Sequence, residues 1–273
     1  ASVGKSFLWE KINASEQQHF YDDHPGYGSI MPLGTDPLTD GELKFILQWI
    51  LEGAPEHGTV ARVSDLADTQ RYSPPPFKAL DKPQNGIQLH VEPFDVPPNF
   101  EREFFMYKNL NNRSPIYVNR VQIEMRPGSH HFIGYLLDSS RPLFSLAKRL
   151  FVPNRIRDLH LTNGDDDPLV LASMNYLNFF AGTQTPRFDY EFPKGVALRL
   201  PANTGLDLNT HYVNRGEEAF EGEVYMNLHT IEKANVEHEA KIINFNSTDI
   251  ELPPNKITTL TRDVRATEKM NIF

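Results

Sequence analysis

The chain has 273 residues, a net charge of -9 and no cysteine. This length suits one large domain or two modest ones, and an acidic chain with no lysine/arginine cluster argues against nucleic acid and anionic membranes as partners. Without cysteine the chain cannot form disulfides, zinc–thiolate sites or iron–sulfur clusters, so its ten histidines are the main candidate metal ligands.

The N-terminal segment has helical patterning. A helix is predicted from Thr39 to Glu52, because Thr39 and Glu42 have the spacing of a capping box and the residues after them form one apolar stripe. Gly53 provides a stop signal. A shorter helix is predicted from Ser6 to Ile12. No apolar run approaches the roughly 20 residues needed to cross a bilayer, so no membrane span is expected.

Residues 56–85 lose all periodicity and contain three consecutive prolines, which predicts a linker. From residue 86 onward the pattern becomes that of strands. Many short strands separated by turn signals predict a mainly β chain and a β-sandwich over residues 86–235. A helix from Arg141 to Phe151 is the expected exception, and Asp165 to Asp167 is interpreted as a solvated acidic loop. The clearest strands are Asn119–Glu124, Phe132–Leu137, Gly195–Leu200, Gly205–Tyr212 and Glu223–His229.

Two adjacent histidines, His130 and His131, stand just before one of these strands. Neighbours in a regular strand point to opposite faces and rarely share a ligand. They can share one at a strand start or a β-bulge, and the preceding Arg126-Pro127-Gly128-Ser129 is such a place. Taken alone, the pair is better explained by one surface histidine and one core histidine.

A third histidine, His211, lies on the polar side of the strand Gly205–Tyr212, together with Asp207 and Asn209. Three imidazoles would suit copper or zinc, and a sandwich can bring distant strands side by side. Spacing alone does not show that it does, since a hydrogen-bonded strand histidine is common. The other histidines lack motif support: His90, His160, His229 and His238 are interpreted as structural or surface residues, and His24 stays unassigned.

Residues 121–135, Val-Gln-Ile-Glu-Met-Arg-Pro-Gly-Ser-His-His-Phe-Ile-Gly-Tyr, resemble the first copper motif of the copper type II, ascorbate-dependent monooxygenases of the peptidylglycine/dopamine type. In that family a strand leads into a His-His pair and then into an apolar strand. Residues 192–200 and the run from Gly205 to Tyr212 are similar to the second motif, with His211 at the third imidazole. Residues 223–229 resemble the strand that closes the domain.

This resemblance spans residues 86–232 and implies a jelly-roll sandwich in which His130, His131 and His211 hold the electron-transfer copper. The chain also departs from the family pattern. The family's second copper, where oxygen and substrate meet, needs a His-x-His pair, and this sequence contains none. Residues 236–273 look like the start of a second, truncated sandwich domain, with strands expected at 242–245, 252–254 and 257–264. No catalytic residue is assigned.

Residues 1–55 resemble the C-terminal half of a small class I cytochrome c domain. Met31 then matches the axial methionine of a haem iron, a ligand that raises haem potential, and the haem-attachment cysteines would precede Ala1. Haem c would accordingly be a second cofactor. The alternative is an ordinary loop methionine packed on the apolar face of the Thr39–Glu52 helix.

The resemblance implies a copper-binding oxidoreductase, part of an exported monooxygenase with a fused cytochrome c domain. Its expected location is periplasmic or extracellular, and its expected partners are an electron donor and a small organic or peptide-like substrate. One alternative is a non-catalytic copper, electron-relay or structural subunit of a larger extracytoplasmic assembly. Another is a carbohydrate- or protein-binding sandwich with incidental histidines, which predicts no metal.

Overall fold

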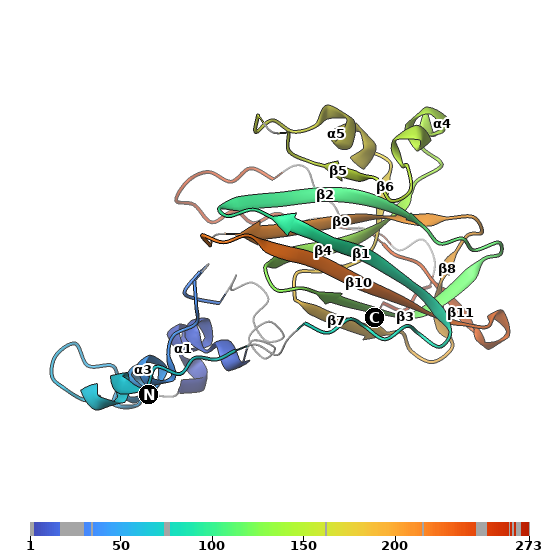
Figure 1. The fold of residues 1–273 in the computed structure, drawn as a ribbon. Helices are drawn as coiled ribbons and strands as arrows, with labels where there is room; N and C mark the ends of the chain where they lie inside the picture. The colour runs from blue at the N-terminus through green and yellow to red at the C-terminus, as the bar shows by residue number, and fades with distance from the viewer. Residues whose placement is uncertain are drawn as a thin grey trace.

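The computed structural model describes residues 3–16, 30–33, 35–73, 77–161, 163–214, 216–243, 250–261, 263, 265 and 269–272. Strands predominate in these residues and form two sheets that face each other, so the mainly β architecture and the sandwich predicted from the sequence are confirmed (Figure 1). The region with a predicted strand pattern, from residue 86 onward, carries all the named strands.

The first sheet has six strands in the order β1-β10-β3-β8-β11, with β7 also paired to β3. The second has five strands in the order β5-β2-β9-β4-β6, so β9 is its central strand. Neighbouring strands are antiparallel except for β11 and β8, which are parallel. The strands are β1 (Gly86–Val96), β2 (Phe100–Asn109), β3 (Ile116–Met125), β4 (Ser129–Leu137), β5 (Ile156–Asp158), β6 (Leu177–Thr183), β7 (Arg187–Glu191), β8 (Val196–Leu200), β9 (Gly205–Asn214), β10 (Phe220–Ile231) and β11 (His238–Ala240).

The hydrophobic core lies between the two sheets. Strand β9 contributes Leu206, Leu208 and Tyr212 to this core, all with no exposed surface. The alternation of side chains along a strand then directs Asp207, Asn209 and His211 to the outer face of the second sheet, as the sequence predicts. That outer face is itself covered, because every residue of β9 except Val213 is buried.

A buried ion pair lies on this outer face. The guanidinium of Arg157 on β5 donates a hydrogen bond to the Asp207 carboxylate and a second, of 3.0 Å, to the Ser173 hydroxyl. The side chains of Arg157 and Asp207 are 8% and 0% exposed. Arg157 also lies over the rings of Phe105 and Phe151. Burial raises the pKa of Asp207, and the neighbouring guanidinium opposes that rise.

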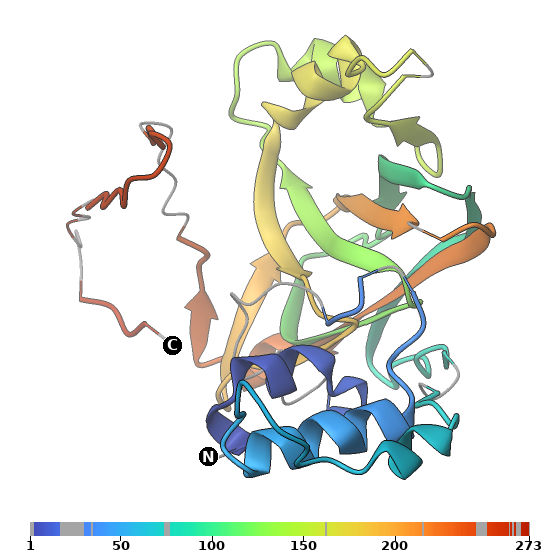
Figure 2. The same ribbon diagram turned by 90° about the vertical axis from the view of Figure 1, so that its left-hand side faces the viewer.

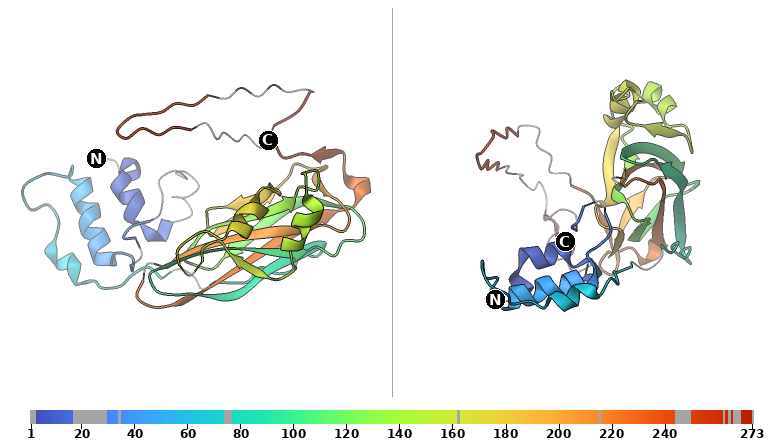
Figure 3. Two further views of the ribbon diagram at one scale, coloured as in Figure 1. Left: turned by 90° about the horizontal axis from the view of Figure 1, so that it is seen from above. Right: turned by 60° about the vertical axis from the view of Figure 1, so that its left-hand side comes forward.

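The two predicted N-terminal helices are confirmed. Helix α3 (Asp40–Leu51) begins with the complete capping box of Thr39 and Glu42, and helix α1 (Phe7–Ile12) is capped by the Ser6 hydroxyl. They lie together beside one end of the sandwich (Figures 1 and 3). Three short 3-10 turns accompany them: η1 (Val3–Lys5), η2 (Ala14–Glu16) and η3 (Val63–Ala67).

The helix predicted from Arg141 to Phe151 is wrong in extent. Only α4 (Phe144–Ala147) is α-helical, and the 3-10 turn η4 (Lys148–Leu150) follows it. Leu143, directly before α4, has a left-handed backbone (φ 62°), which an α-helix cannot contain. The sequence also did not indicate α5 (Pro168–Met174). Asp167 of the predicted acidic loop caps this helix by accepting hydrogen bonds from Leu169 and Val170.

The segments on either side of the predicted sandwich have little regular structure. The described residues of the linker contain only η3 and a β-bridge from Arg71 to Thr39; Pro74 to Pro76 lie outside the described residues. Beyond η5 (Lys233–Asn235), strand β11 pairs with β8 of the first sheet. The described residues after β11 form no helix or strand, and Figure 2 shows them leading away from the sheets.

The strands expected at 252–254 and 257–264 are therefore not formed in the described residues. The strand expected at 242–245 lies partly outside them, at Asn244 and Phe245, and so does His24. No helix among the described residues is long and apolar enough to cross a membrane.

Candidate metal centre

A β-bulge at the start of β4 places the adjacent histidines on one site. Ser129 pairs with Tyr212 of β9 and His131 pairs with His211, so His130 is an extra residue with no counterpart on β9. A bulge breaks the strict alternation of side chains. As a result, the Nδ1 atoms of His130 and His131 lie 3.3 Å apart instead of on opposite faces of the sheet. The bulge predicted from the sequence is present.

The turn before the bulge depends on Gly128. Its φ of +92° lies in the left-handed region, and a Cβ added there would lie 2.4 Å from the Phe220 ring. Its carbonyl accepts a 3.0 Å hydrogen bond from the Val213 amide of β9, which anchors the turn beside His211. Glycine therefore fits this position for both backbone conformation and space.

Replacing Gly128 with alanine should destabilise the fold by about 1–3 kcal/mol through crowding, with left-handed strain in addition. Gly53→Ala is the matched control, because Gly53 has the same φ of +92° but nothing within 4 Å of an added Cβ. Urea unfolding of both variants separates the free-energy cost of crowding against Phe220 from the cost of the left-handed backbone. Equal losses of stability in the two variants would mean that the Phe220 ring moves aside without cost.

Strand pairing brings the third histidine to the same place. His211 on the central strand pairs with His131 on one side and with Glu103 of β2 on the other. Side chains of directly paired residues have Cβ atoms about 4.5–5.5 Å apart and share one face of the sheet. Glu103, His211 and His131 therefore form a row across three strands.

The three imidazoles converge through their Nδ1 atoms. The Nδ1 atoms of His211 and His131 lie 3.2 Å apart, and one ligand nitrogen from each of the three rings lies within 4.8 Å of the others. Two nitrogens bound to one tetrahedral ion at 2.0–2.1 Å lie about 3.3–3.4 Å apart. The cluster of His130, His131 and His211 can therefore hold a metal ion. His211 is buried, His131 is half-buried and His130 is exposed.

Hydrogen-bond acceptors behind two of the rings set the tautomers that a metal requires. His131 Nε2 lies 2.7 Å from Asn209 Oδ1, and His211 Nε2 lies 2.7 Å from the Glu101 carboxylate. Both oxygens accept hydrogen bonds, so the ring protons belong on Nε2 and the lone pairs on Nδ1. Asn209 is itself oriented, because its amide nitrogen donates to Glu103 over 2.9 Å. Two lone pairs 3.2 Å apart repel each other unless a proton or a metal cation lies between them.

The pKa values of His131, His211 and Glu103 are shifted by burial and by the close approach of these three side chains. Burial would lower the pKa of His131, but hydrogen bonds to Glu103 and Asn209 raise it above its usual value. Burial lowers the pKa of His211, and the charges of His131 and His130 add to that effect. Burial would raise the pKa of Glu103, yet hydrogen bonds from His131 and Asn209 and the charge of His211 hold it at about 2. Beside the ionised Glu103, His131 thus favours its protonated form, whereas His211 favours its neutral form.

In the metal-free protein, Glu103 should contribute stability above pH 4.5, its ordinary pKa, and this contribution should be lost as the pH falls towards about 2. The sign follows because the folded state holds the carboxylate ionised where the unfolded chain would protonate it. Glu103→Gln should therefore flatten the dependence of unfolding free energy on pH in this range. Urea unfolding at several pH values measures it, with Glu239→Gln on exposed strand β11 as the charge-loss control. If Glu103→Gln leaves the slope of unfolding free energy against pH unchanged, the lowered pKa of Glu103 is contradicted.

The structure brings His130, His131 and His211 together in one cluster. Met31 does not belong to this cluster. The Met31 side chain is 40% exposed, and its amide donates to the Lys11 carbonyl. Three histidines interpreted as structural or surface residues have partners outside the cluster: His90 contacts Glu92 and Glu223, His160 contacts Asp166, and His229 contacts Gln122. The fourth, His238, is exposed.

Sequence reasoning missed Glu101 and Glu103, because β2 was not among the predicted strands. Their spacing of two residues, with Arg102 between them, is the signal that would have placed both carboxylates on one face.

Comparison of the chain with protein-family models and with curated proteins found no match to either. The resemblance to the copper monooxygenases therefore rests on the motif residues and on the site they form.

Proposed function

We propose that this chain is a copper-binding oxidoreductase domain that carries the electron-transfer copper of an exported monooxygenase similar to the peptidylglycine/dopamine type. The observation that carries the proposal is the bulged histidine pair of β4 meeting His211 of β9, with one nitrogen of each ring within 4.8 Å of the others. The family resemblance assigns copper to the same three residues. A jelly-roll topology for the sandwich belongs to the same proposal.

The ligand set favours copper over other metals. Three imidazoles with no thiolate suit copper, zinc, iron or nickel, and Cu²⁺ binds most tightly among the divalent first-row metals. Three protein ligands leave at least one coordination position open, which separates this site from closed four-ligand structural zinc sites. Glu101 and Glu103 place two carboxylates beside the cluster, and these would balance the charge of a divalent ion.

The chain's own residues would hold the site in a fixed geometry. Bound copper supplies one-electron transfer between its two common oxidation states. Asn209 and Glu101 fix the ring planes of His131 and His211 through Nε2, so the ligands need little rearrangement when the charge at the centre changes. Because His130 is exposed, the site is accessible to an electron donor.

The remaining parts of the proposal rest on resemblance. Residues 1–55 would belong to a cytochrome c domain with Met31 as a haem ligand, and the protein would work in the periplasm or outside the cell. An electron donor and a small organic or peptide-like substrate would be its partners. These 273 residues contain no His-x-His pair, and the alternative function is that of a non-catalytic copper or electron-relay subunit within a larger assembly.

The test is titration of the metal-free protein with Cu²⁺, followed by electron paramagnetic resonance. The expected result is saturation at one copper per chain, a type 2 spectrum with nitrogen hyperfine structure, and reversible loss of the signal on reduction. Zn²⁺ should compete only weakly. No stoichiometric binding would overturn the proposal and leave a sandwich with incidental histidines. Tight zinc binding with no stable copper would refute the electron-transfer role while keeping the metal centre.

A further inference from the structure

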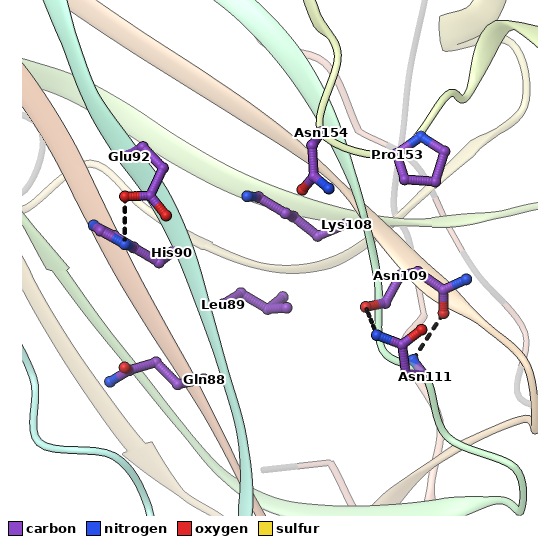
Figure 4. A pocket seen from close by; sticks show the side chains of 9 residues that line it. All are labelled: Gln88, Leu89, His90, Glu92, Lys108, Asn109, Asn111, Pro153 and Asn154. Atoms are coloured by element: carbon purple, nitrogen blue, oxygen red, sulfur yellow. Dashed lines mark hydrogen bonds and ion pairs between the residues drawn. The ribbon is translucent and has the colours of Figure 1, made fainter.

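A second candidate site lies away from the histidine cluster. A pocket of about 440 Å³ opens beside β1, the edge strand of the first sheet (Figure 4). This volume falls within the range of about 300–1,000 Å³ found for small-molecule sites. Strand β1, the end of β2 and the Pro153-Asn154 segment form its walls. Along β2 the pocket is five residues, or about 16 Å, from Glu103 of the metal centre.

The pocket contains one unpaired charge. Glu92 lies 3.1 Å from His90 Nδ1, and the other nitrogen of that ring lies 2.8 Å from Glu223. Lys108, which also lines the pocket, has neither an ion pair nor a hydrogen bond from its ammonium group within the described chain. Figure 4 shows its side chain extending from β2 toward β1, into the space between the walls. Partial burial of a cation that has no counter-ion is unfavourable in free energy, because the cation loses part of its hydration.

One amide group lies near this cation in Figure 4, that of Asn154. The Asn154 side chain has no hydrogen-bond partner among the described residues. Asn154 is fixed in place, because its backbone amide donates to the Tyr107 carbonyl over 2.9 Å. A ligand would therefore meet a donor that is already positioned.

The electrostatics of Lys108 agree with this geometry. Burial lowers the pKa of Lys108, while the charge of Glu92 acts in the opposite direction. The ammonium group has thus lost part of its hydration without gaining a partner within the protein. An anion in the pocket would supply that partner. A neutral ligand would leave the charge uncompensated.

We propose that this pocket binds a small organic carboxylate, with Lys108 as the counter-ion and the amide of Asn154 as a hydrogen-bond donor. The carboxylate lies against the Lys108 ammonium, and the rest of the ligand packs over Leu89, which also lines the pocket. The site is independent of copper and requires no particular activity of the metal centre. A phosphate group offers the same oxyanion chemistry, so the test compares the two.

The test titrates succinate, inorganic phosphate and glycerol separately into the metal-free full chain at low salt and follows backbone amide signals by NMR. Saturable shifts centred on residues 88–92, 108–111 and 153–154 with succinate are expected. Lys108→Gln should weaken succinate binding at least tenfold, and Lys233→Gln, which removes a lysine outside the pocket, should leave it unchanged. Asn154→Gly, which tolerates the left-handed backbone at this position (φ 63°), should weaken binding several-fold.

Each outcome of the titration either supports or overturns the proposed carboxylate site. Succinate binding that is lost in Lys108→Gln and retained in Lys233→Gln supports the proposal. Saturation by phosphate and not by succinate would replace the carboxylate by a phosphate ligand and overturn the class named here. No saturable shift, equal response to glycerol, or shifts confined to the histidine cluster would overturn the pocket as an anion site. If Lys108→Gln does not fold, Asn154→Gly carries the same comparison.

Discussion

Replacing His211 with alanine is expected to lower Cu²⁺ affinity by more than about a hundredfold, since changes to outer-shell partners alone cost roughly 10–100-fold. His211 stands on the central strand and pairs with both other elements of the site, so its loss leaves only the two histidines of the bulge. The nitrogen hyperfine pattern of any remaining copper should change as well. Calorimetric titration and electron paramagnetic resonance measure both effects.

The control for this prediction is His229→Ala. His229 on β10 is bonded to Gln122 and lies outside the cluster, so its removal should leave copper binding unchanged. Unfolding measurements on metal-free His211→Ala separate loss of a ligand from loss of the fold. A folded His211→Ala protein that binds copper as tightly as the parent would refute the three-histidine site.

Replacing Arg157 with leucine is expected to destabilise the protein by about 3–5 kcal/mol, the typical cost of leaving one buried charge without its partner. Asp207 has no exposed surface, and its second carboxylate oxygen has no hydrogen-bond partner among the described residues even with Arg157 present. Removing the guanidinium leaves this carboxylate to be protonated or hydrated inside the protein. Urea unfolding at neutral pH measures the loss.

The double variant Arg157→Leu/Asp207→Leu distinguishes the cost of an orphaned charge from the loss of packing. It should recover most of the stability, because replacing a whole buried ion pair by apolar residues is often neutral or favourable. Arg120→Leu is the surface control: the Arg120–Asp189 pair is partly exposed and should cost at most about 1 kcal/mol. A double variant as unstable as Arg157→Leu would show that shape, and not charge, dominates at this site.

The sequence predicted those features of the fold and of the site that depend on neighbouring residues in the chain. The Thr39/Glu42 capping box predicted the start of α3 because both partners lie within one helical turn. The alternation along β9 predicted which face carries His211, since side-chain direction follows from strand geometry alone. Likewise, the turn before His130 indicated a bulge. None of these local patterns could show which strands become neighbours.

The features that sequence reasoning missed depend on long-range packing. Strand β2 lacks a clean alternation because Phe104, Phe105 and Met106 are all buried, one face by the core and the other by Leu159 and Val170. Glu101 and Glu103 lie beside the histidine cluster because β2 pairs with β9, and that pairing is not encoded in the local sequence. In the same way, the apolar stripe at residues 143–150 suggested one helix, but the left-handed backbone of Leu143 and a 3-10 turn shortened it.

The three histidines are not equally constrained, and this inequality determines how an ion would leave. His131 and His211 are held from behind by Asn209 and Glu101, whereas the Nε2 atom of exposed His130 has no hydrogen-bond partner in the described part of the chain. If a metal ion is bound, rotation of His130 would break one coordinate bond and its ring contacts with His131 and His211, but no hydrogen bond at Nε2. Dissociation would begin at this ring, and chelators or a metal-delivering protein would exchange the ion along the same route. The lifetime of a bound ion would then depend on the freedom of one surface side chain, while its affinity would depend mainly on the two anchored rings.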